Sequence, residues 1–344
     1  MPSIAVVILN YNGKQLLSDL LPTVLAHSTT AEVIVADNAS TDGSIALLKQ
    51  DFPTVRRIEL NKNYGFAEGY NLALKQLQTD YYVLLNSDVA VTENWLQPLV
   101  AYMEQNPQTA ACQPKLKNFN HRDYFEYAGA CGGFIDQYGY PFCRGRILDT
   151  VEKDNGQYDE IADIFWATGA CFFVRTADFW EVGGLDARFF AHMEEVDLCW
   201  RLKSRGKSIV CIPQSVVYHI GAKTLNADSP FKTFLNFRNN LLMIYKNMPS
   251  ANMRWVLFVR WWLDILAALH LLLQRKPKNA LNILKAQWIF LKLRKDFRAD
   301  RTKNLALSKV DYPIGFFKNS ILIKYYLKSH KTAQSLFSKK TSYR

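Results

Sequence analysis

Short apolar runs and longer amphipathic segments alternate along the first part of the chain. Apolar, β-branched runs at residues 3–9, 32–36, 55–60 and 81–85 predict strands. Segments with helical spacing at 14–27, 44–51 and 65–77 lie between them and predict helices. Because such alternation is typical of βαβ units, we expect an α/β fold with a mainly parallel, Rossmann-like central sheet flanked by helices.

The pattern is less regular from about residue 112 to residue 165, where Gly, aromatic and charged residues predict loops or an antiparallel edge. It recovers with a strand at 165–175, a helix at 194–205 and short strands at 208–212 and 215–219. Helical spacing at 231–247 and an aromatic, apolar helix at 253–273 follow. We therefore divide the chain into an α/β domain of residues 1–225 and a C-terminal helical extension of residues 226–344.

The helix predicted at 253–273 is apolar enough to raise the question of a membrane. A transmembrane helix needs about 20 largely uncharged residues, but Arg260 and Asp264 interrupt this one, four positions apart, where they can pair. Three arrangements stay open: a helix lying in the headgroups of anionic lipid, a core helix packed on the main domain, and a true span. We favour the first, because basic residues flank the aromatic segment.

The net charge of +11 is unevenly distributed. Residues 251–344 hold 20 Lys and Arg against 4 Asp and Glu, which leaves 22 and 27 for residues 1–250. The α/β domain is therefore mildly acidic, and its charge does not favour nucleic-acid binding. With 49% hydrophobic and 21% charged residues, the composition is that of a globular protein.

Two features indicate a cytoplasmic location. Met1 leads directly into the first predicted strand, without the charged and apolar regions of a signal peptide. The six cysteines show no CxxC spacing and have mostly apolar neighbours, so we expect buried free thiols in a reducing compartment. A zinc site or a disulfide framework is the alternative.

Polar residues directly follow three of the predicted strands: Asn10, Tyr11 and Asn12, then Asp37 and Asn38, then Asn86, Ser87 and Asp88. Ligands of open α/β sheets bind at such strand ends, where these side chains can bond a pyrimidine and a ribose. A carboxylate such as Asp88 suits Mg²⁺ or Mn²⁺ bound to a diphosphate. The alternative is an aspartate that caps a following helix near Asn94.

The segment NKNYGFAEGYN at residues 61–71 contains Asn63, Gly65 and Asn71. Its glycines permit close approach of a ligand to the backbone, or they reflect tight packing of a helix on the sheet. His219, which follows an apolar strand, is either structural or a third metal ligand beside Asp88.

Three acids, Glu194, Glu195 and Asp197, stand at the start of the helix predicted at 194–205. The helix dipole favours carboxylates there, so a purely structural role competes. Their mutual repulsion raises one pKa, as a general base requires. In a helix Glu194, Asp197 and Arg201 share a face, whereas Glu195 projects about 100° away and can point into a crevice.

Together these segments resemble the inverting glycosyltransferases of family 2 with the GT-A fold, and in particular the bacterial rhamnosyltransferase-like branch that builds surface polysaccharides. The resemblance covers about residues 3–222 and rests on VVILNYNG, ADNASTDGS, NYGFAEGYN, NSD, GACFFVR and the acid cluster. It implies that residues 1–225 are the catalytic domain. Asn86–Ser87–Asp88 looks like the family's DxD-type metal triplet, with Asn in place of the first acid, and His219 matches its late metal-contacting histidine.

The resemblance also implies roles for the remaining residues. Donor binding falls to Asn10, Tyr11, Asn12, Asp37, Asn38, Ser40, Asn63, Gly65, Asn71, Asn86, Ser87 and Gly169. The Glu194–Asp197 segment looks like the family's E-D-x-D motif, whose second acid is the usual base. Glu195 stands at that position in place of Asp, so the choice between Glu195 and Glu194 stays open.

The implied activity is a metal-dependent, inverting transfer from a dTDP- or UDP-linked sugar, with rhamnose as the first choice. The implied acceptor is a hydroxyl of a growing, lipid-linked cell-surface glycan at the inner face of the cell membrane. A dinucleotide-dependent oxidoreductase would need GxGxxG after the first strand, which this chain lacks. A non-catalytic nucleotide-sugar binder or membrane scaffold would tolerate loss of the acids, and all of them are present. Nucleic-acid binding by the basic tail would be salt-sensitive.

Overall fold

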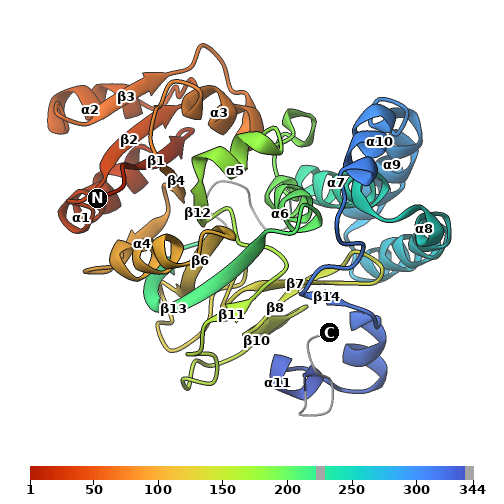
Figure 1. The fold of residues 1–344 in the computed structure, drawn as a ribbon. Helices are drawn as coiled ribbons and strands as arrows, with labels where there is room; N and C mark the ends of the chain where they lie inside the picture. The colour runs from red at the N-terminus through yellow and green to blue at the C-terminus, as the bar shows by residue number, and fades with distance from the viewer. Residues whose placement is uncertain (222–228, 338–344) are drawn as a thin grey trace.

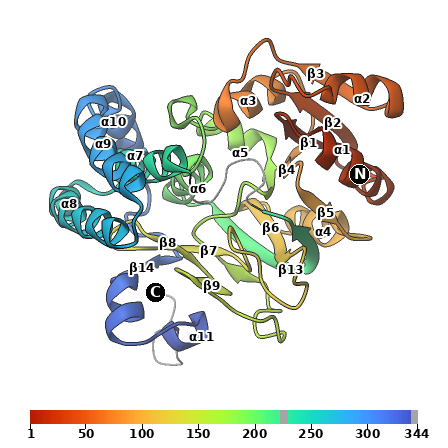
Figure 2. The same ribbon diagram turned by 180° about the vertical axis from the view of Figure 1, so that it is seen from behind.

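The protein is built around a nine-stranded mixed sheet (Figures 1 and 2). The computed structural model describes residues 1–221 and 229–337. The strand order is β11-β13-β6-β12-β4-β1-β2-β3, and β5 pairs with β13. The strands are β1 (Ile4–Asn10), β2 (Glu32–Asp37), β3 (Arg56–Glu59), β4 (Tyr81–Asn86), β5 (Val89–Val91), β6 (Thr109–Asn118), β11 (Ala162–Asp163), β12 (Cys171–Arg175) and β13 (Ser208–His219). Six of them run in one direction and β12 opposes its neighbours, so the prediction of a mainly parallel sheet is confirmed.

Helices cover both faces of this sheet, because its strands are apolar on both sides. In β1, Ala5 and Val7 face a core that includes Tyr70 of α3, whereas Val6 and Ile8 face a second core with α1. The helices of this part are α1 (Lys14–His27), α2 (Ser44–Asp51), α3 (Gly65–Leu74), α4 (Leu96–Gln105), α5 (Thr176–Glu181), η1 (Ala187–Phe189) and α6 (Glu194–Ser204). The helices predicted at 14–27 and 44–51 have the observed bounds.

Two strand predictions need correction. The strand expected at 165–175 is shorter, because the backbone N–H groups of Phe165 and Trp166 both donate to Gly133 O and bend the chain. The two strands expected at 208–212 and 215–219 form one strand, β13, which has an irregularity between Ile212 and Val216. The irregular stretch also contains β6, a strand of the central sheet that the pattern did not predict.

A second, five-stranded sheet has the order β10-β9-β8-β7-β14. It consists of β7 (Gly133–Asp136), β8 (Pro141–Cys143), β9 (Arg146–Ile147), β10 (Thr150–Val151) and β14 (Phe316–Phe317). The first four pair antiparallel, as expected for this stretch, and β14 joins from the C-terminal region. The buried Asp136 carboxylate accepts the N–H of Ile321 at 2.9 Å, which fixes the C-terminal segment to this sheet.

The helices of the C-terminal region are α7 (Pro230–Asn247), α8 (Ser250–Leu273), α9 (Pro277–Leu293), α10 (Arg298–Ala306), the π-helical turn η2 (Ile323–Leu327) and α11 (Ala333–Leu336). Helices α7 to α10 gather at the side of the molecule opposite β1–β3, whereas α11 lies beside the five-stranded sheet (Figures 1 and 2). α7 packs against α6, α8, α9 and α10. All six cysteines are free and buried, as expected.

Candidate active site

Polar groups at the ends of β1 and β2 form one hydrogen-bonded network. Asn10 and Asp37 are register partners, and Asn10 Nδ2 donates to Asp37 Oδ2 at 2.8 Å. Ser40 Oγ accepts from Asn10 Nδ2 at 3.1 Å and from the N–H of Asn12 at 2.9 Å. Asn10 Oδ1 is buried without a hydrogen-bond partner among the described residues, and Tyr11 is exposed beside it. The network therefore presents an unpaired acceptor and an aromatic ring, which suits a nucleoside.

The start of α3 joins this network to the acid cluster. Asn38 Nδ2 donates to Gly65 O at 2.9 Å and to Asn63 Oδ1 at 3.1 Å. Gly65 has φ +75°, and a Cβ there would lie 2.5 Å from the ring of Phe190. The next N–H, of Phe66, donates to Phe190 O at 2.6 Å. Gly65 therefore permits a close contact between the strand ends and the loop that precedes α6.

The end of β4 contacts the start of α1 and the residues that precede β12. Ser87 Oγ is 3.5 Å from the position of a Cβ built on Gly13, at the start of α1. The N–H of Asn86 donates to Ala170 O at 3.0 Å, which places Asn86 beside Gly169. Asn71 lies elsewhere, because its amide bonds both the N–H and the C=O of Leu185, at 3.1 and 2.7 Å. The contacts of Asn71 are thus those of a residue that fixes α3 to the chain before η1.

Asp88 and His219 face each other in the interior. His219 Nε2 is 3.0 Å from Asp88 Oδ1, and both side chains are buried. The chain continues from Asp88 into β5, so Asp88 caps no helix. β5 pairs with β13, whose last residue is His219, and this pairing brings the two side chains together. A separation of 3.0 Å suits two ligands of one divalent ion.

A second acid, Glu126, stands on the other side of the imidazole. Its Oε1 is 3.2 Å from His219 Nδ1. Burial alone would lower the pKa of His219, but its contacts with Asp88 and Glu126 raise the pKa to about 10. Burial alone would raise the pKa of Asp88, but the hydrogen bond to His219 lowers it below the usual value. In metal sites a carboxylate in the place of Glu126 orients the ligating imidazole.

The donor set therefore fits a hard divalent ion. Asp88 and His219 would supply one oxygen and one nitrogen, and the ion would offset the charge of a diphosphate. No group of three His, Cys, Asp or Glu side chains within residues 1–221 and 229–337 could hold a metal ion by itself.

The loop before α6 has a strained backbone. Phe190, His192 and Met193 have φ values of 66°, 69° and 72°, in a region that residues other than glycine rarely adopt. Asn239 of α7 holds this loop, since its Nδ2 lies within 2.9 Å of the carbonyl oxygens of Phe189, Ala191 and His192. Such strain persists only where the surroundings fix it, and it concentrates at functional sites.

The three acids of α6 have different environments. Both carboxylate oxygens of Asp197 have partners. Arg201 and Lys246 pair with it at 2.8 and 2.9 Å, and Asn247 donates to it at 2.7 Å. Glu194 Oε2 and Glu195 Oε2 are buried and lack hydrogen-bond partners among the described residues. Asp197 therefore fastens α6 to α7, and the two glutamates are the acids that can meet a substrate.

The pKa values of both glutamates are raised. For Glu194, burial and the charge of Glu195 raise the pKa well above its usual value. For Glu195, burial raises the pKa to about 7, against hydrogen bonds from nearby backbone N–H groups. A carboxyl group with a pKa near 7 is suited to take up a proton at neutral pH.

Sequence reasoning missed Glu126, Asn239 and His192. Glu126 lies in the irregular stretch, where nothing in the local pattern distinguishes it. Asn239 was one polar residue of an amphipathic helix. His192, whose buried Nε2 has no partner among the described residues, stands two positions before Glu194. This closeness to the acids could have identified His192 as a candidate site residue from the sequence.

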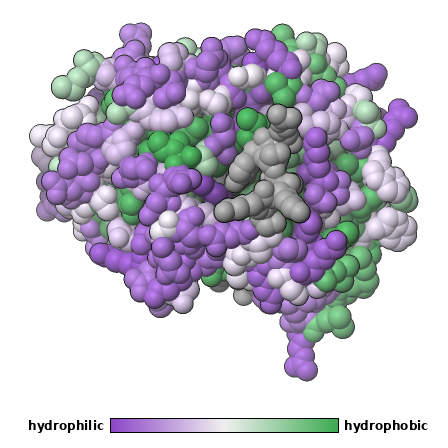
Figure 3. Space-filling view, turned by 60° about the horizontal axis from the view of Figure 1, so that its bottom comes forward, coloured by the Kyte–Doolittle hydropathy of each residue, from purple (hydrophilic) through white to green (hydrophobic). Residues whose placement is uncertain are grey.

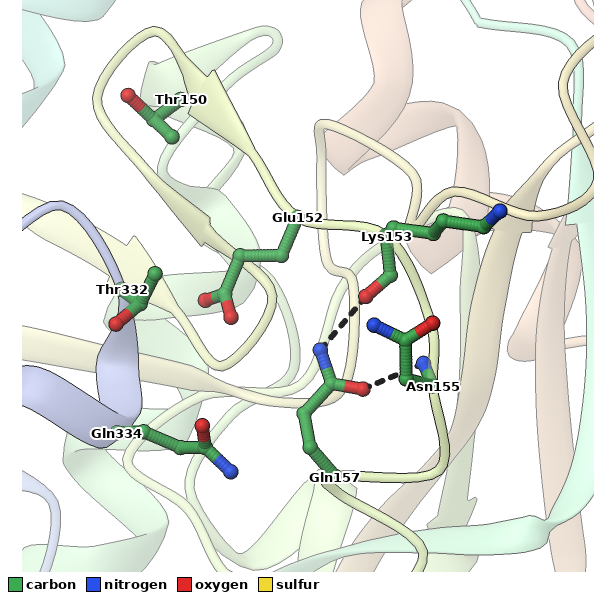
Figure 4. A pocket seen from close by; sticks show the side chains of 7 residues that line it. All are labelled: Thr150, Glu152, Lys153, Asn155, Gln157, Thr332 and Gln334. Carbon is green, nitrogen blue, oxygen red and sulfur yellow. Dashed lines mark hydrogen bonds between the residues drawn. The ribbon is translucent and has the colours of Figure 1, made fainter.

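A surface cavity of about 430 Å³ lies apart from these residues (Figure 4). It is lined by Thr150, Glu152, Lys153, Asn155, Gln157, Thr332 and Gln334. None of them is a candidate site residue, and Figure 4 shows Gln157 bonded to the backbone of Lys153 and Asn155 within the lining. We assign the site by the strand ends and their unpaired groups, because they supply the chemistry that this cavity lacks.

The comparisons with known proteins agree with this geometry. A family model described as glycosyl transferase family 2 matches residues 5–182. This match spans more than half of the chain, and the chain therefore belongs to glycosyl transferase family 2.

The similar curated proteins include bacterial rhamnosyltransferases, which confirms the resemblance to that branch. The N-acetylglucosaminyl-diphospho-decaprenol L-rhamnosyltransferase of Mycobacterium tuberculosis is 25% identical over 73% of this chain and 88% of its own length. Rhamnosyltransferase WbbL of Escherichia coli is 22% identical over 62% of this chain and 82% of its own.

A solved structure has the same fold. A mannosyltransferase from Pyrobaculum calidifontis, in complex with GDP-Man and Mn²⁺, superposes with a TM-score of 0.51. It is 14% identical, and the match covers 89% of this chain and 85% of that one. The GT-A fold expected from the sequence is confirmed.

Proposed function

We propose that this protein is a metal-dependent inverting glycosyltransferase that moves a sugar from a nucleoside diphosphate to an acceptor hydroxyl. The observation that carries the proposal is the buried Asp88–His219 pair, 3.0 Å apart at the strand ends, in a chain that also keeps two unpaired glutamates at the start of α6. In this proposal Asn10, Asp37 and Ser40 bind the nucleoside. Bound Mg²⁺ or Mn²⁺ would stabilise the negative charge of the leaving diphosphate.

Glu195 is the proposed base. Its carboxylate accepts the proton of the acceptor hydroxyl while that oxygen forms a bond to the anomeric carbon. The bond from this carbon to the diphosphate breaks, and the electron pair leaves with the diphosphate oxygen. Because the attack comes from the face opposite the leaving group, the product has inverted anomeric configuration.

The donor we favour is dTDP-rhamnose, with UDP-hexoses next, since the similar curated proteins are rhamnosyltransferases. The acceptor we favour is a lipid-linked oligosaccharide, because the relative from Mycobacterium tuberculosis is named for a diphospho-decaprenol acceptor. The basic, aromatic C-terminal region suits a cytoplasmic enzyme bound at the inner face of the membrane. We retain residues 1–225 as the catalytic part.

The test is a donor screen scored by release of the nucleoside diphosphate in the presence of Mg²⁺ or Mn²⁺. We expect one donor to be turned over, and Asp88→Ala to abolish turnover. Glu93→Gln, which changes an exposed acid after β5, is the control and should retain activity. Donor binding without turnover of any donor and acceptor pair would instead favour a non-catalytic nucleotide-sugar protein.

A further inference from the structure

Helix α8 carries the Arg260–Asp264 ion pair on its inner face and large apolar groups on its outer face. Its buried residues are Val256, Arg260, Asp264 and Ala268, which recur every four positions on one face. Its exposed apolar residues are Trp255, Phe258, Trp261, Trp262, Leu266, Leu269, Leu272 and Leu273, with exposed fractions from 38% to 85%. A helix on the surface of a soluble protein has the opposite arrangement.

The inner face of α8 is bound to the body of the protein. Arg260 pairs with Asp264 at 3.1 Å and donates to Tyr138 O, in the turn between β7 and β8, at 2.9 Å. It also bonds Asn240 of α7. By length and composition alone α8 could cross a membrane, but a span would expose this charged pair to lipid. The structure therefore favours a helix that lies along the surface of the protein over one that spans a membrane.

Helix α9 extends the apolar surface. Its exposed apolar residues are Leu281, Leu284, Trp288 and Leu291. Its buried residue Asn279 donates to Thr233 of α7 at 2.9 Å, so the inner faces of α8 and α9 both face α7. The two helices also pack against each other, since Gln287 of α9 donates to Trp261 O of α8 at 3.0 Å, and both lie at the edge of the molecule (Figures 1 and 2). Apolar surface lies along the right-hand side of Figure 3, the side that α8 occupies in Figure 1.

The charge around this surface has one sign. Residues 251–295 contain nine Lys and Arg and a single acid, the buried Asp264. The exposed basic residues are Arg254, Arg275, Lys278, Lys285, Lys292, Arg294 and Lys295. Lys292 Nζ lies 3.3 Å from the centre of the Trp288 ring, a cation–π contact between two exposed side chains. A partner that complements this surface has a negatively charged exterior and an apolar interior that the Trp and Leu side chains can enter.

We propose that the outer face of α8 and α9 docks on an anionic phospholipid bilayer, with both helices parallel to the membrane plane. Tryptophan at the level of the headgroups and basic residues against anionic lipid are the two contributions that hold such helices. A second copy of the chain fits less well, because two copies would bring two basic rims together. The inference gives the proposed lipid-linked acceptor a location, and its test needs no turnover.

The experiment measures sedimentation of the full chain with vesicles. One set is phosphatidylcholine with about 30 mol% phosphatidylglycerol, and the other is phosphatidylcholine alone. We expect binding to the anionic vesicles, with weakening on going from about 0.1 M to about 0.5 M salt. Leu266→Asp and Lys285→Glu/Lys292→Glu should each lower the partition coefficient about ten-fold. Ile161→Asp, at an exposed apolar residue off this face, is the matched control and should bind as the unchanged protein does.

Two results would overturn the inference. One is equal binding of the unchanged protein and the Leu266→Asp variant to anionic vesicles. The other is a dimer in the absence of lipid that Leu266→Asp dissociates, since this would assign the face to a second copy. Release of nucleoside diphosphate with a water-soluble acceptor is measured in parallel. This release does not depend on the outer face of α8 and α9. If the unchanged protein releases no nucleoside diphosphate in this assay, the result counts against the proposed function alone.

Discussion

At the residue scale, Glu194 and Glu195 differ in what raises the pKa of each carboxyl group. Burial and the charge of Glu195 raise the pKa of Glu194 well above its usual value, which favours its uncharged form, and Gln is an uncharged side chain of the same shape. Glu195, with a pKa of about 7, is partly ionised. We predict that Glu195→Gln lowers kcat about 100- to 10,000-fold with little change in donor affinity. Glu194→Gln should cost far less, and steady-state kinetics with a donor titration would compare the two.

The same assignment predicts the pH dependence. A general base works only when deprotonated, so kcat/KM should fall as pH drops through about 7 and level off above it. The pH–rate profile of the unchanged enzyme tests this, and the residual activity of Glu195→Gln should lack the acidic limb. A profile in which Glu194→Gln removes that limb would transfer the role to Glu194.

Glu126 shows which part of the site the sequence did not reveal. Asp88 and His219 were predictable, because each follows an apolar strand and polar residues at strand ends converge. Glu126 follows no such strand, and it reaches His219 only after the chain has returned through β13. We predict that Glu126→Gln weakens Mn²⁺ binding about 10- to 100-fold, measured by titration in the presence of the donor nucleotide. Unchanged affinity would refute an orienting role.

At the element scale, α7 fixes the loop that precedes the acids of α6. The amide of Asn239 reaches three carbonyl groups of that loop, where the backbone is strained. We predict that Asn239→Ala lowers kcat while leaving the donor KM nearly unchanged, because the strand-end residues stay in place. Removing the donor of these buried bonds should also cost about 1–3 kcal/mol of stability.

Asn236→Ala, on a less buried side of the same helix, is the control for Asn239 and should change neither quantity much. An Asn239→Ala variant that loses stability but keeps kcat would show that the amide supports the fold alone. Kinetics and chemical denaturation of the same preparations separate these outcomes.

The buried pair on α8 gives a second prediction at this scale. Arg260→Leu leaves the Asp264 carboxylate buried without its cation, which should lower the free energy of unfolding by about 3–5 kcal/mol. The double variant Arg260→Leu/Asp264→Leu removes both charges and should recover most of that loss. Urea unfolding of the unchanged protein, of Arg260→Leu, of Asp264→Leu and of the double variant measures the cycle. Additive losses would show that the two side chains do not interact.

Elements with one uniform pattern were predictable, whereas elements stabilised by distant partners were not. Helix α1 was predicted with its observed bounds, because its apolar residues repeat at helical spacing. Strand β6 was missed, since its buried positions include Gln113 and Lys115. Lys115 can be buried because two acids far along the chain pair with it, Asp154 at 3.2 Å and Asp159. The inward charges of α8 depend in the same way on α7 and the turn after β7.

At the scale of the whole molecule, the two parts into which the sequence divides share one structure. Lys246 and Asn247 of α7 bond Asp197 of α6, and β14 completes the sheet that begins with β7. We predict that a chain ending at residue 225 is unstable, because it leaves Asp197 with only Arg201 and exposes the apolar faces that α7 and β14 cover. Thermal unfolding followed by circular dichroism should show a lower or absent transition.

Co-expression of residues 226–344 with that fragment is the informative control. If the helices act by completing the fold, the two pieces should associate and restore both the transition and the release of nucleoside diphosphate. A fragment of residues 1–225 that folds and turns over donor by itself would contradict this prediction. It would show that the loop before α6 keeps its strained backbone without Asn239. It would also show that the C-terminal helices serve only to bring the enzyme to its acceptor.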